Sequence, residues 1–164
     1  MKFDHYLNRA QESSEFKKFK GKHEKAYLCA GFFVLDFESG KNMHQIDFYI
    51  PTNKKIATFN LHEGIDFHVS KGVMKKKPKV LDNNIKLDLE QLKGIVEDEM
   101  HNRTVTHEIK KIIAVIQNVD GKKTWVLNCI TDGLGLIKVN IDDSDESVLK
   151  FEKANLMDFI KKVK

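Results

Sequence analysis

The chain has 164 residues, of which 41% are hydrophobic and 32% charged, with a formal net charge of +4. This length suits one domain or two small units that share a core, and the composition excludes an intrinsically disordered chain. The longest apolar run, residues 26–35, is about half as long as a membrane-spanning helix, and the first residues lack the apolar region of a signal peptide. We therefore expect a cytoplasmic protein with no membrane partner.

The N-terminal segment carries apolar residues at helical spacing. These are Phe3, Leu7, Ala10, Phe16 and Phe19. The polar step Ser13-Ser14-Glu15 interrupts the pattern, which favours one broken helix or two short helices.

Six apolar or alternating segments predict β-strands in two groups of three. The first group is 26–37, 43–50 and 56–61, and the second is 109–119, 124–130 and 134–141. The alternation predicts that one face of each sheet is buried, and the Gly-, Asn- and Asp-rich connectors predict antiparallel turns. Asp132-Gly133 therefore predicts a hairpin turn. A phosphate-binding loop would need a helix after it, and a strand follows.

The two groups align as an internal repeat. Gly40-Lys41 falls on Gly121-Lys122, Ile46 and Phe48 fall on Leu127 and Cys129, and, after one deleted residue, Ala57, Phe59 and Leu61 fall on Ile137, Val139 and Ile141. The alignment keeps the inward and outward alternation of every strand, which a slip of one residue would invert.

A second helix is predicted over residues 87–100, where Leu89, Leu92, Val96 and Met100 form one apolar stripe. Asp88 and Gln91 have the spacing of a capping box at its start. Gly94 lowers the helix propensity, so we expect it to mark a close packing contact. Residues 155–164 predict a further, C-terminal helix with cationic residues in its last turn.

These elements predict an α+β fold of two tandem units, residues 1–80 and 81–164. Each unit would contain a helix and a three-stranded antiparallel meander, with the helices packed on one face of the sheet or sheets. The pattern leaves open whether the two sheets join edge to edge.

The residues that carry chemistry form no catalytic or metal-binding motif. The acidic run 142–146 lacks the central glycine of a calcium loop and predicts a solvated turn. The histidine pairs in 62–68 and 101–107 do not have the helical spacing of zinc ligands. Cys29 and Cys129 lie in apolar strands, where a thiol is a weak nucleophile and is expected to stay reduced. We expect no cofactor, no metal and no enzymatic activity.

Two segments are rich in lysine, residues 17–25 and 70–79. Such segments can neutralise phosphates and so bind nucleic acid in a salt-dependent way, although a solvated connector gives the same pattern. The candidate binding residues are Lys17, Lys18, Lys20, Lys71, Lys75, Lys76, Lys77 and Lys79.

Residues 87–153 resemble a PepSY-type unit. The similarity rests on Asp120-Gly121-Lys122, Trp125, Val139-Asn140-Ile141-Asp142 and the closing Val148-Leu149. The family commonly has a glycine in its acidic turn, where this chain has Asp145-Glu146-Ser147. The resemblance implies a small non-enzymatic binding or regulatory module and supplies no catalytic residues.

We therefore expect a binding module that contacts an unidentified protein partner through its sheet edges and the 70–79 segment, as a monomer or homodimer. Nucleic-acid binding through the lysines is one alternative. The other is small-ligand binding between helix and sheet, in a cavity lined by Phe32, Phe48 and Trp125.

Overall fold

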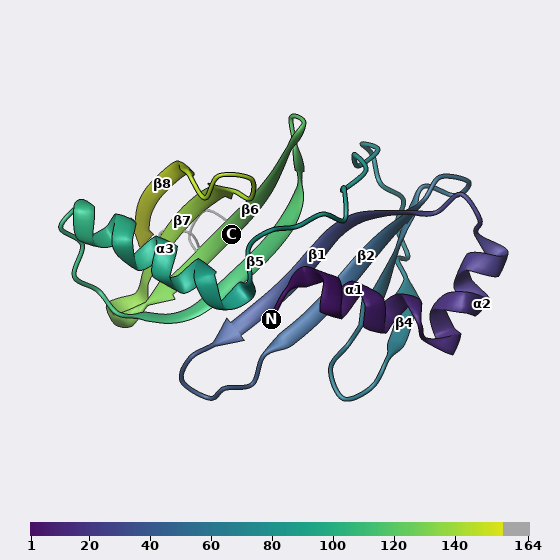
Figure 1. The fold of residues 1–164 in the computed structure, drawn as a ribbon, viewed down its shortest axis with the longest axis horizontal. Helices are drawn as coiled ribbons and strands as arrows, with labels where there is room; N and C mark the ends of the chain where they lie inside the picture. Colours follow the sequence, from purple (N-terminus) through teal and green to yellow (C-terminus); the bar gives the residue numbers. More distant parts are fainter. Residues whose placement is uncertain (156–164) are drawn as a thin grey trace.

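The computed structural model describes residues 1–155, which form three α-helices and eight β-strands (Figure 1). In chain order these are α1 (Phe3–Gln11), α2 (Ser14–Lys22), β1 (Tyr27–Asp36), β2 (Met43–Ile50), β3 (Lys55–Asn60), β4 (Asp66–Val69), α3 (Leu89–Asn102), β5 (Ile109–Val119), β6 (Lys122–Thr131), β7 (Gly135–Asp142) and β8 (Val148–Asn155). None of the described helices is long and apolar enough to cross a membrane.

All eight strands belong to one antiparallel sheet, in the order β4-β3-β2-β1-β5-β6-β7-β8. The central pair is β1 with β5, where Phe33 lies opposite Ala114. The predicted fold of two helix-plus-three-strand units is therefore wrong, although the class is α+β. The physical reason is that β1 and β5, both strongly apolar, would each leave an unpaired edge in a separate sheet, and their pairing removes both edges.

The two outermost strands, β4 and β8, were not predicted. Every residue of β4 is exposed, and most of β8 is exposed as well. Neither strand has the clear apolar alternation that reveals a half-buried strand in a sequence. Both are held by backbone pairing, β4 to β3 and β8 to β7.

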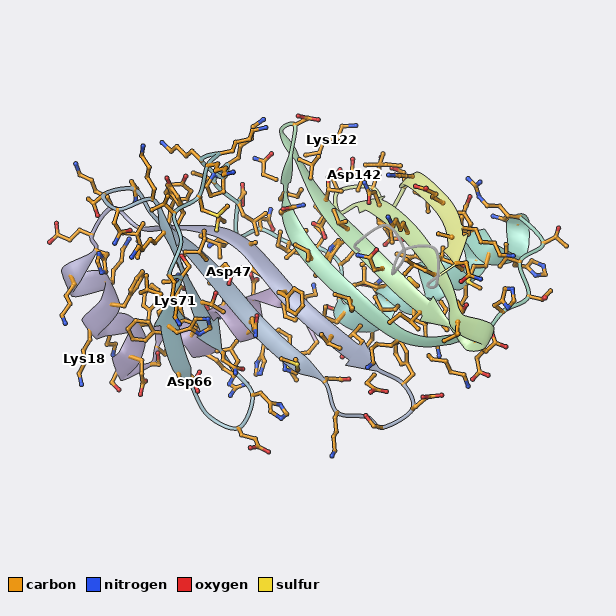
Figure 2. The ribbon with its side chains drawn as sticks, turned by 180° about the vertical axis from the view of Figure 1, so that it is seen from behind. Lys18, Asp47, Asp66, Lys71, Lys122 and Asp142 are labelled. Carbon is orange, nitrogen blue, oxygen red and sulfur yellow. The ribbon has the colours of Figure 1, made fainter. Side chains whose placement is uncertain are left out.

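The helices cover one face of the sheet. Figure 1 shows α1 over β1 and β2, and α3 over the other half of the sheet. Figure 2 shows the opposite face of the sheet, which no described helix covers. The aligned strand positions all point into the single core between helices and sheet. They are Ile46, Phe48, Ala57, Phe59 and Leu61 in the first half and Leu127, Cys129, Ile137, Val139 and Ile141 in the second.

The helix ends follow the local sequence signals. The N-terminal segment forms two short helices, and the Ser13 hydroxyl accepts a hydrogen bond from the Phe16 N–H over 3.1 Å at the start of α2. At the start of α3, the Gln91 side chain accepts from the Asp88 N–H over 2.8 Å. The predicted C-terminal helix lies outside the described residues, apart from Asn155, which ends β8.

The predicted close contact at Gly94 is wrong, because no atom lies within 4 Å of the position where its Cβ would stand. The close approach occurs instead at Gly31 of β1. A Cβ on Gly31 would lie 2.6 Å from the Phe3 ring of α1. Gly31 thus lets α1 pack directly on the sheet.

The acidic run 142–146 is only partly solvated. Asp145 and Glu146 are exposed as expected, but Asp142 and Asp143 are buried. The Asp143 carboxylate accepts hydrogen bonds from the Lys86 and Leu87 N–H groups over 2.8 and 3.0 Å. It therefore fixes the segment that leads from β4 into α3, and the prediction of a solvated turn is wrong at this residue.

Candidate anion-binding surface

The segment between β4 and α3 crosses one end of the sheet and is fixed there by hydrogen bonds. The Met74 N–H donates to the Lys54 carbonyl over 2.7 Å, and the Tyr27 hydroxyl donates to the Pro78 carbonyl over 2.6 Å. Farther along, the Leu81 N–H donates to the Leu28 carbonyl over 3.0 Å. The segment therefore runs beside the β2–β3 turn and the start of β1.

This path gathers lysines from three parts of the chain. We call them the lysine-rich end: Lys22, Lys25, Lys54, Lys75, Lys76, Lys77 and Lys79. All seven side chains are exposed. Lys22 and Lys25 border a depression of about 230 Å³ together with residues 50–52, and Lys76, Lys77 and Lys79 border one of about 320 Å³ together with residues 117–120.

Two acidic residues, Glu24 and Asp120, also border the two depressions of the lysine-rich end, against seven lysines. Within residues 1–155, no salt bridge involves any of its seven ammonium groups. Away from the lysine-rich end, Figure 2 shows Lys122 of the β5–β6 hairpin near Asp142, at the start of the acidic turn. There, hydrogen bonds from Ser147 lower the pKa of Asp145, and Lys122 lowers it further. A cluster of lysines without carboxylate partners produces a local positive potential.

The structure divides the predicted binding residues. Lys75, Lys76, Lys77 and Lys79 belong to the lysine-rich end, and Lys71 lies just after β4, at the start of the same segment.

The lysines predicted on α2 border neither of these two depressions. Lys17 and Lys18 are exposed on α2, in the part of the helix that precedes Lys22. Lys20 is half-buried and donates to the Ala26 carbonyl over 2.6 Å. The sequence analysis did not name Lys22, Lys25 or Lys54 as binding residues. Lys22 and Lys25 lie within the predicted segment 17–25, whereas Lys54 gives no signal beyond its place in a turn, because its contact with Met74 is tertiary.

A reactive thiol or a metal site finds little support among the described residues. Burial raises the pKa of the Cys29 and Cys129 thiols to about 12, so neither forms a thiolate at neutral pH. No group of three or more His, Cys, Asp or Glu side chains within residues 1–155 is arranged to hold a metal.

The three aromatic residues that were expected to line a ligand cavity do not meet in one. Trp125 is buried in the core, and Phe32 points to the opposite face of the sheet from its neighbour Phe33. Of the three, only Phe48 lines the cavity of about 620 Å³ between α1, α2 and the start of β1. The other apolar residues that line this cavity include Leu7, Phe16 and Leu28.

The two sheet edges differ in length. Among the described strands, nothing pairs with the outer side of β4, which has four residues, or of β8, which has eight. The longer edge carries Lys150, Glu152 and Lys153. Charged side chains on an edge strand oppose the addition of another strand.

Comparison with known proteins gives a fold and no function. No family model matches the chain, and no curated protein matches it. The structure is similar to the crystal structure of a putative lipoprotein from Clostridium difficile 630, with 15% sequence identity and a TM-score of 0.56. The alignment covers 84% of this chain and 89% of that chain. At this identity the similarity shows the fold alone, and the resemblance to PepSY-type units stays a prediction.

Proposed function

We propose that this protein binds nucleic acid through the lysine-rich end. The observation that supports the proposal is the gathering of seven exposed lysines from three segments, none of which forms a salt bridge among residues 1–155. Each lysine that approaches a phosphate releases counterions, and this release favours binding at low salt.

The composition of this surface favours contacts to the backbone over contacts to bases. Arg9 and Arg103, the two arginines of the chain, lie on α1 and just after α3, outside the lysine-rich end. Phe16 and Phe19 are buried in the core, so they cannot stack on bases. Lysine acts on phosphate as a point charge and carries little sequence information. We therefore expect binding with weak sequence preference.

A protein partner at the sheet edges is the alternative expected from the sequence. The charged residues of β8 and the shortness of β4 make both edges poor templates for strand addition. At the lysine-rich end, seven lysines outnumber the two carboxylates that border its depressions, Glu24 and Asp120, so we favour nucleic acid.

The test is fluorescence anisotropy with labelled, mixed-sequence single-stranded RNA and DNA. If about four phosphates are neutralised, raising the salt from about 50 to about 200 mM should weaken binding by about 50-fold. Absence of binding by the unmodified protein at the lower salt would overturn the proposal and return attention to a protein partner.

Two variants with equal charge change locate the surface. The first replaces Lys75, Lys76, Lys77 and Lys79 with Gln, and the control replaces Lys17, Lys18, Lys41 and Lys153 with Gln. All eight side chains are exposed, so both variants should fold. We expect the first to abolish most of the binding and the control to weaken it slightly. Equal losses would show a response to net charge alone and would contradict the assigned surface.

A further inference from the structure

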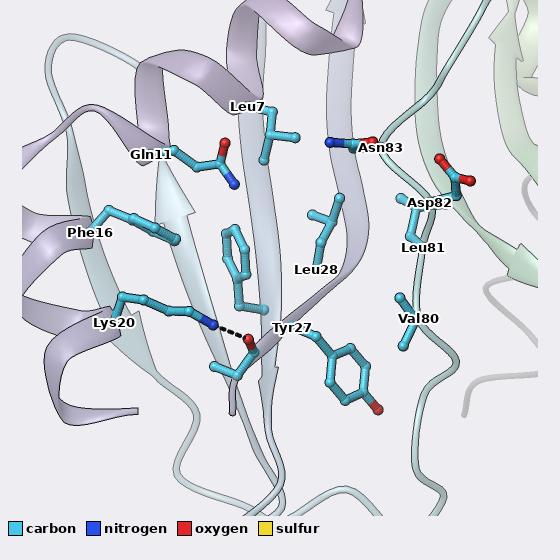
Figure 3. Close-up of a pocket in the computed structure, with 12 residues that line it drawn as sticks. Leu7, Gln11, Phe16, Lys20, Tyr27, Leu28, Val80, Leu81, Asp82 and Asn83 are labelled. Carbon is cyan, nitrogen blue, oxygen red and sulfur yellow. Dashed lines mark hydrogen bonds between the residues drawn. The ribbon is translucent and has the colours of Figure 1, made fainter. Parts of the chain in front are cut away.

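A cavity of about 620 Å³ lies between α1, α2, the first residues of β1 and the linker at residues 80–83 (Figure 3). Its floor is apolar and consists of buried side chains: Leu7, Phe16, Leu28, Phe48 and Leu81. Exposed residues border its opening: Gln11, Val80, Asp82 and Asn83. Ligand pockets in proteins span about 300–1,000 Å³ and combine an apolar lining with a few polar groups in this way.

One cationic side chain faces this cavity. Lys20 lies in the last turn of α2 and is half-buried, and Figure 3 shows it extending from the helix into the cavity. Its ammonium donates one hydrogen bond to the Ala26 carbonyl over 2.6 Å, which leaves two of its three donors for a ligand. Within residues 1–155, no salt bridge involves Lys20. An ammonium group that is partly withdrawn from water and lacks a carboxylate partner favours an anionic ligand.

The lining of the cavity favours a ligand with a single negative charge. Lys20 is the one cation among the described residues that line it, and Asp82 is the one carboxylate. Asp82 is exposed, accepts the Asn84 N–H of its own linker over 2.8 Å and is directed away from the cavity in Figure 3. Asp82 therefore leaves Lys20 unpaired, and it would repel a second negative charge at the opening.

We propose that this cavity binds a small apolar monocarboxylate, such as a medium-chain fatty acid. The carboxylate accepts hydrogen bonds from the Lys20 ammonium, and the alkyl tail lies on the floor formed by Phe16, Leu28 and Phe48. Burial of the tail supplies affinity in proportion to its length, and the charge-assisted hydrogen bonds orient the ligand. This site shares no lysine with the lysine-rich end, and the proposal does not depend on nucleic-acid binding.

Isothermal titration calorimetry with hexanoate, octanoate and decanoate tests the proposal. Octanamide is the neutral match for octanoate, and acetate carries the charge without a tail. We expect binding to tighten by up to about fourfold for each added CH2 group. Octanamide should bind about tenfold more weakly than octanoate, because it lacks the charge-assisted hydrogen bonds, and acetate should not bind. Lack of binding by all three fatty acids, or equal binding of octanoate and octanamide, would overturn the proposal.

Single substitutions on α2 assign the carboxylate site. Lys20→Met should weaken octanoate to the level of octanamide and leave octanamide unchanged. Lys18→Met removes an equal charge from an exposed position outside the cavity and should leave the binding of both molecules unchanged. If octanoate binds the Lys20→Met variant as it binds the unmodified protein, its carboxylate lies elsewhere and the assigned site is wrong. If Lys20→Met weakens octanoate and octanamide alike, Lys20 supports the fold of the cavity and does not bind the carboxylate.

Discussion

The carboxylate of Asp143 accepts a hydrogen bond from the indole Nε1 of Trp125 over 3.0 Å in the protein interior. The exposed fractions of the two residues are 1% and 0%. The same carboxylate accepts the Lys86 and Leu87 N–H groups, so three donors converge on it. One acidic side chain in the β7–β8 turn thereby joins β6 to the linker that leads into α3.

Replacing Asp143 with Ala should destabilise the fold strongly. The change leaves the Trp125 indole and the two backbone N–H groups buried without this acceptor. Each such unsatisfied donor costs about 1–3 kcal/mol, so we expect the free energy of unfolding to fall by about 3 kcal/mol or more. Urea unfolding followed by tryptophan fluorescence measures this change, and Trp125 is the one tryptophan in the sequence.

Asp145→Ala is the matched control in the same turn. Asp145 is exposed, and its carboxylate bonds the Ser147 N–H and hydroxyl over 2.9 and 2.6 Å. Its loss should cost less than about 1 kcal/mol. A similar loss in both variants would mean that the turn conformation matters and the buried carboxylate does not.

The sequence pattern predicts those elements whose own residues carry the signal. Ile46 and Phe48 of β2 alternate with polar residues because one face of β2 is buried, and Leu92 and Val96 of α3 have helical spacing for the same reason. The joining of β1 to β5 leaves no such trace, since a strand buried between two neighbours and one at an edge can have the same apolar run.

The candidate site was predictable only in part. The lysines at 75–79 are visible as a run, but the position of Lys54 beside them depends on how the linker crosses the sheet. Asp143 is equally hidden, because its neighbours Asp142 and Asp145 have the same side chain. Only the tertiary position of the linker separates the buried carboxylate from the exposed one.

Gly31→Ala should destabilise the protein although it adds a single methyl group. The new Cβ would meet the Phe3 ring at 2.6 Å and the Phe33 ring at 2.9 Å, which is too close without a shift of α1. Overpacking of this kind costs about 1–3 kcal/mol. The control is Gly94→Ala, where the Cβ meets nothing within 4 Å and the helix should gain up to about 1 kcal/mol. Urea midpoints that move in the same direction for both variants would contradict this packing.

His44 should make the packing of α1 sensitive to mild acid. Its ring stacks on Tyr6 of α1 with centroids 4.4 Å apart, and the Phe33 ring lies 6.0 Å away. Burial lowers the pKa of His44, and the nearby charges of Arg9 and His62 lower it further. The unfolded chain therefore binds a proton at a higher pH than the folded chain does. The stabilising contribution is present above about pH 6.5 and is lost as the pH falls through the lowered pKa of the folded state.

The variant His44→Phe isolates this effect, because it keeps an aromatic ring against Tyr6 and removes the titrating group. We expect its Tm to fall less than that of the unmodified protein between about pH 7.5 and about pH 5.5. His101→Gln removes an exposed histidine and should leave the fall unchanged. If His44→Phe loses as much Tm as the unmodified protein, the proton that destabilises the fold is taken up elsewhere. A reduced loss confined to His44→Phe would place the acid-sensitive contact between α1 and β2.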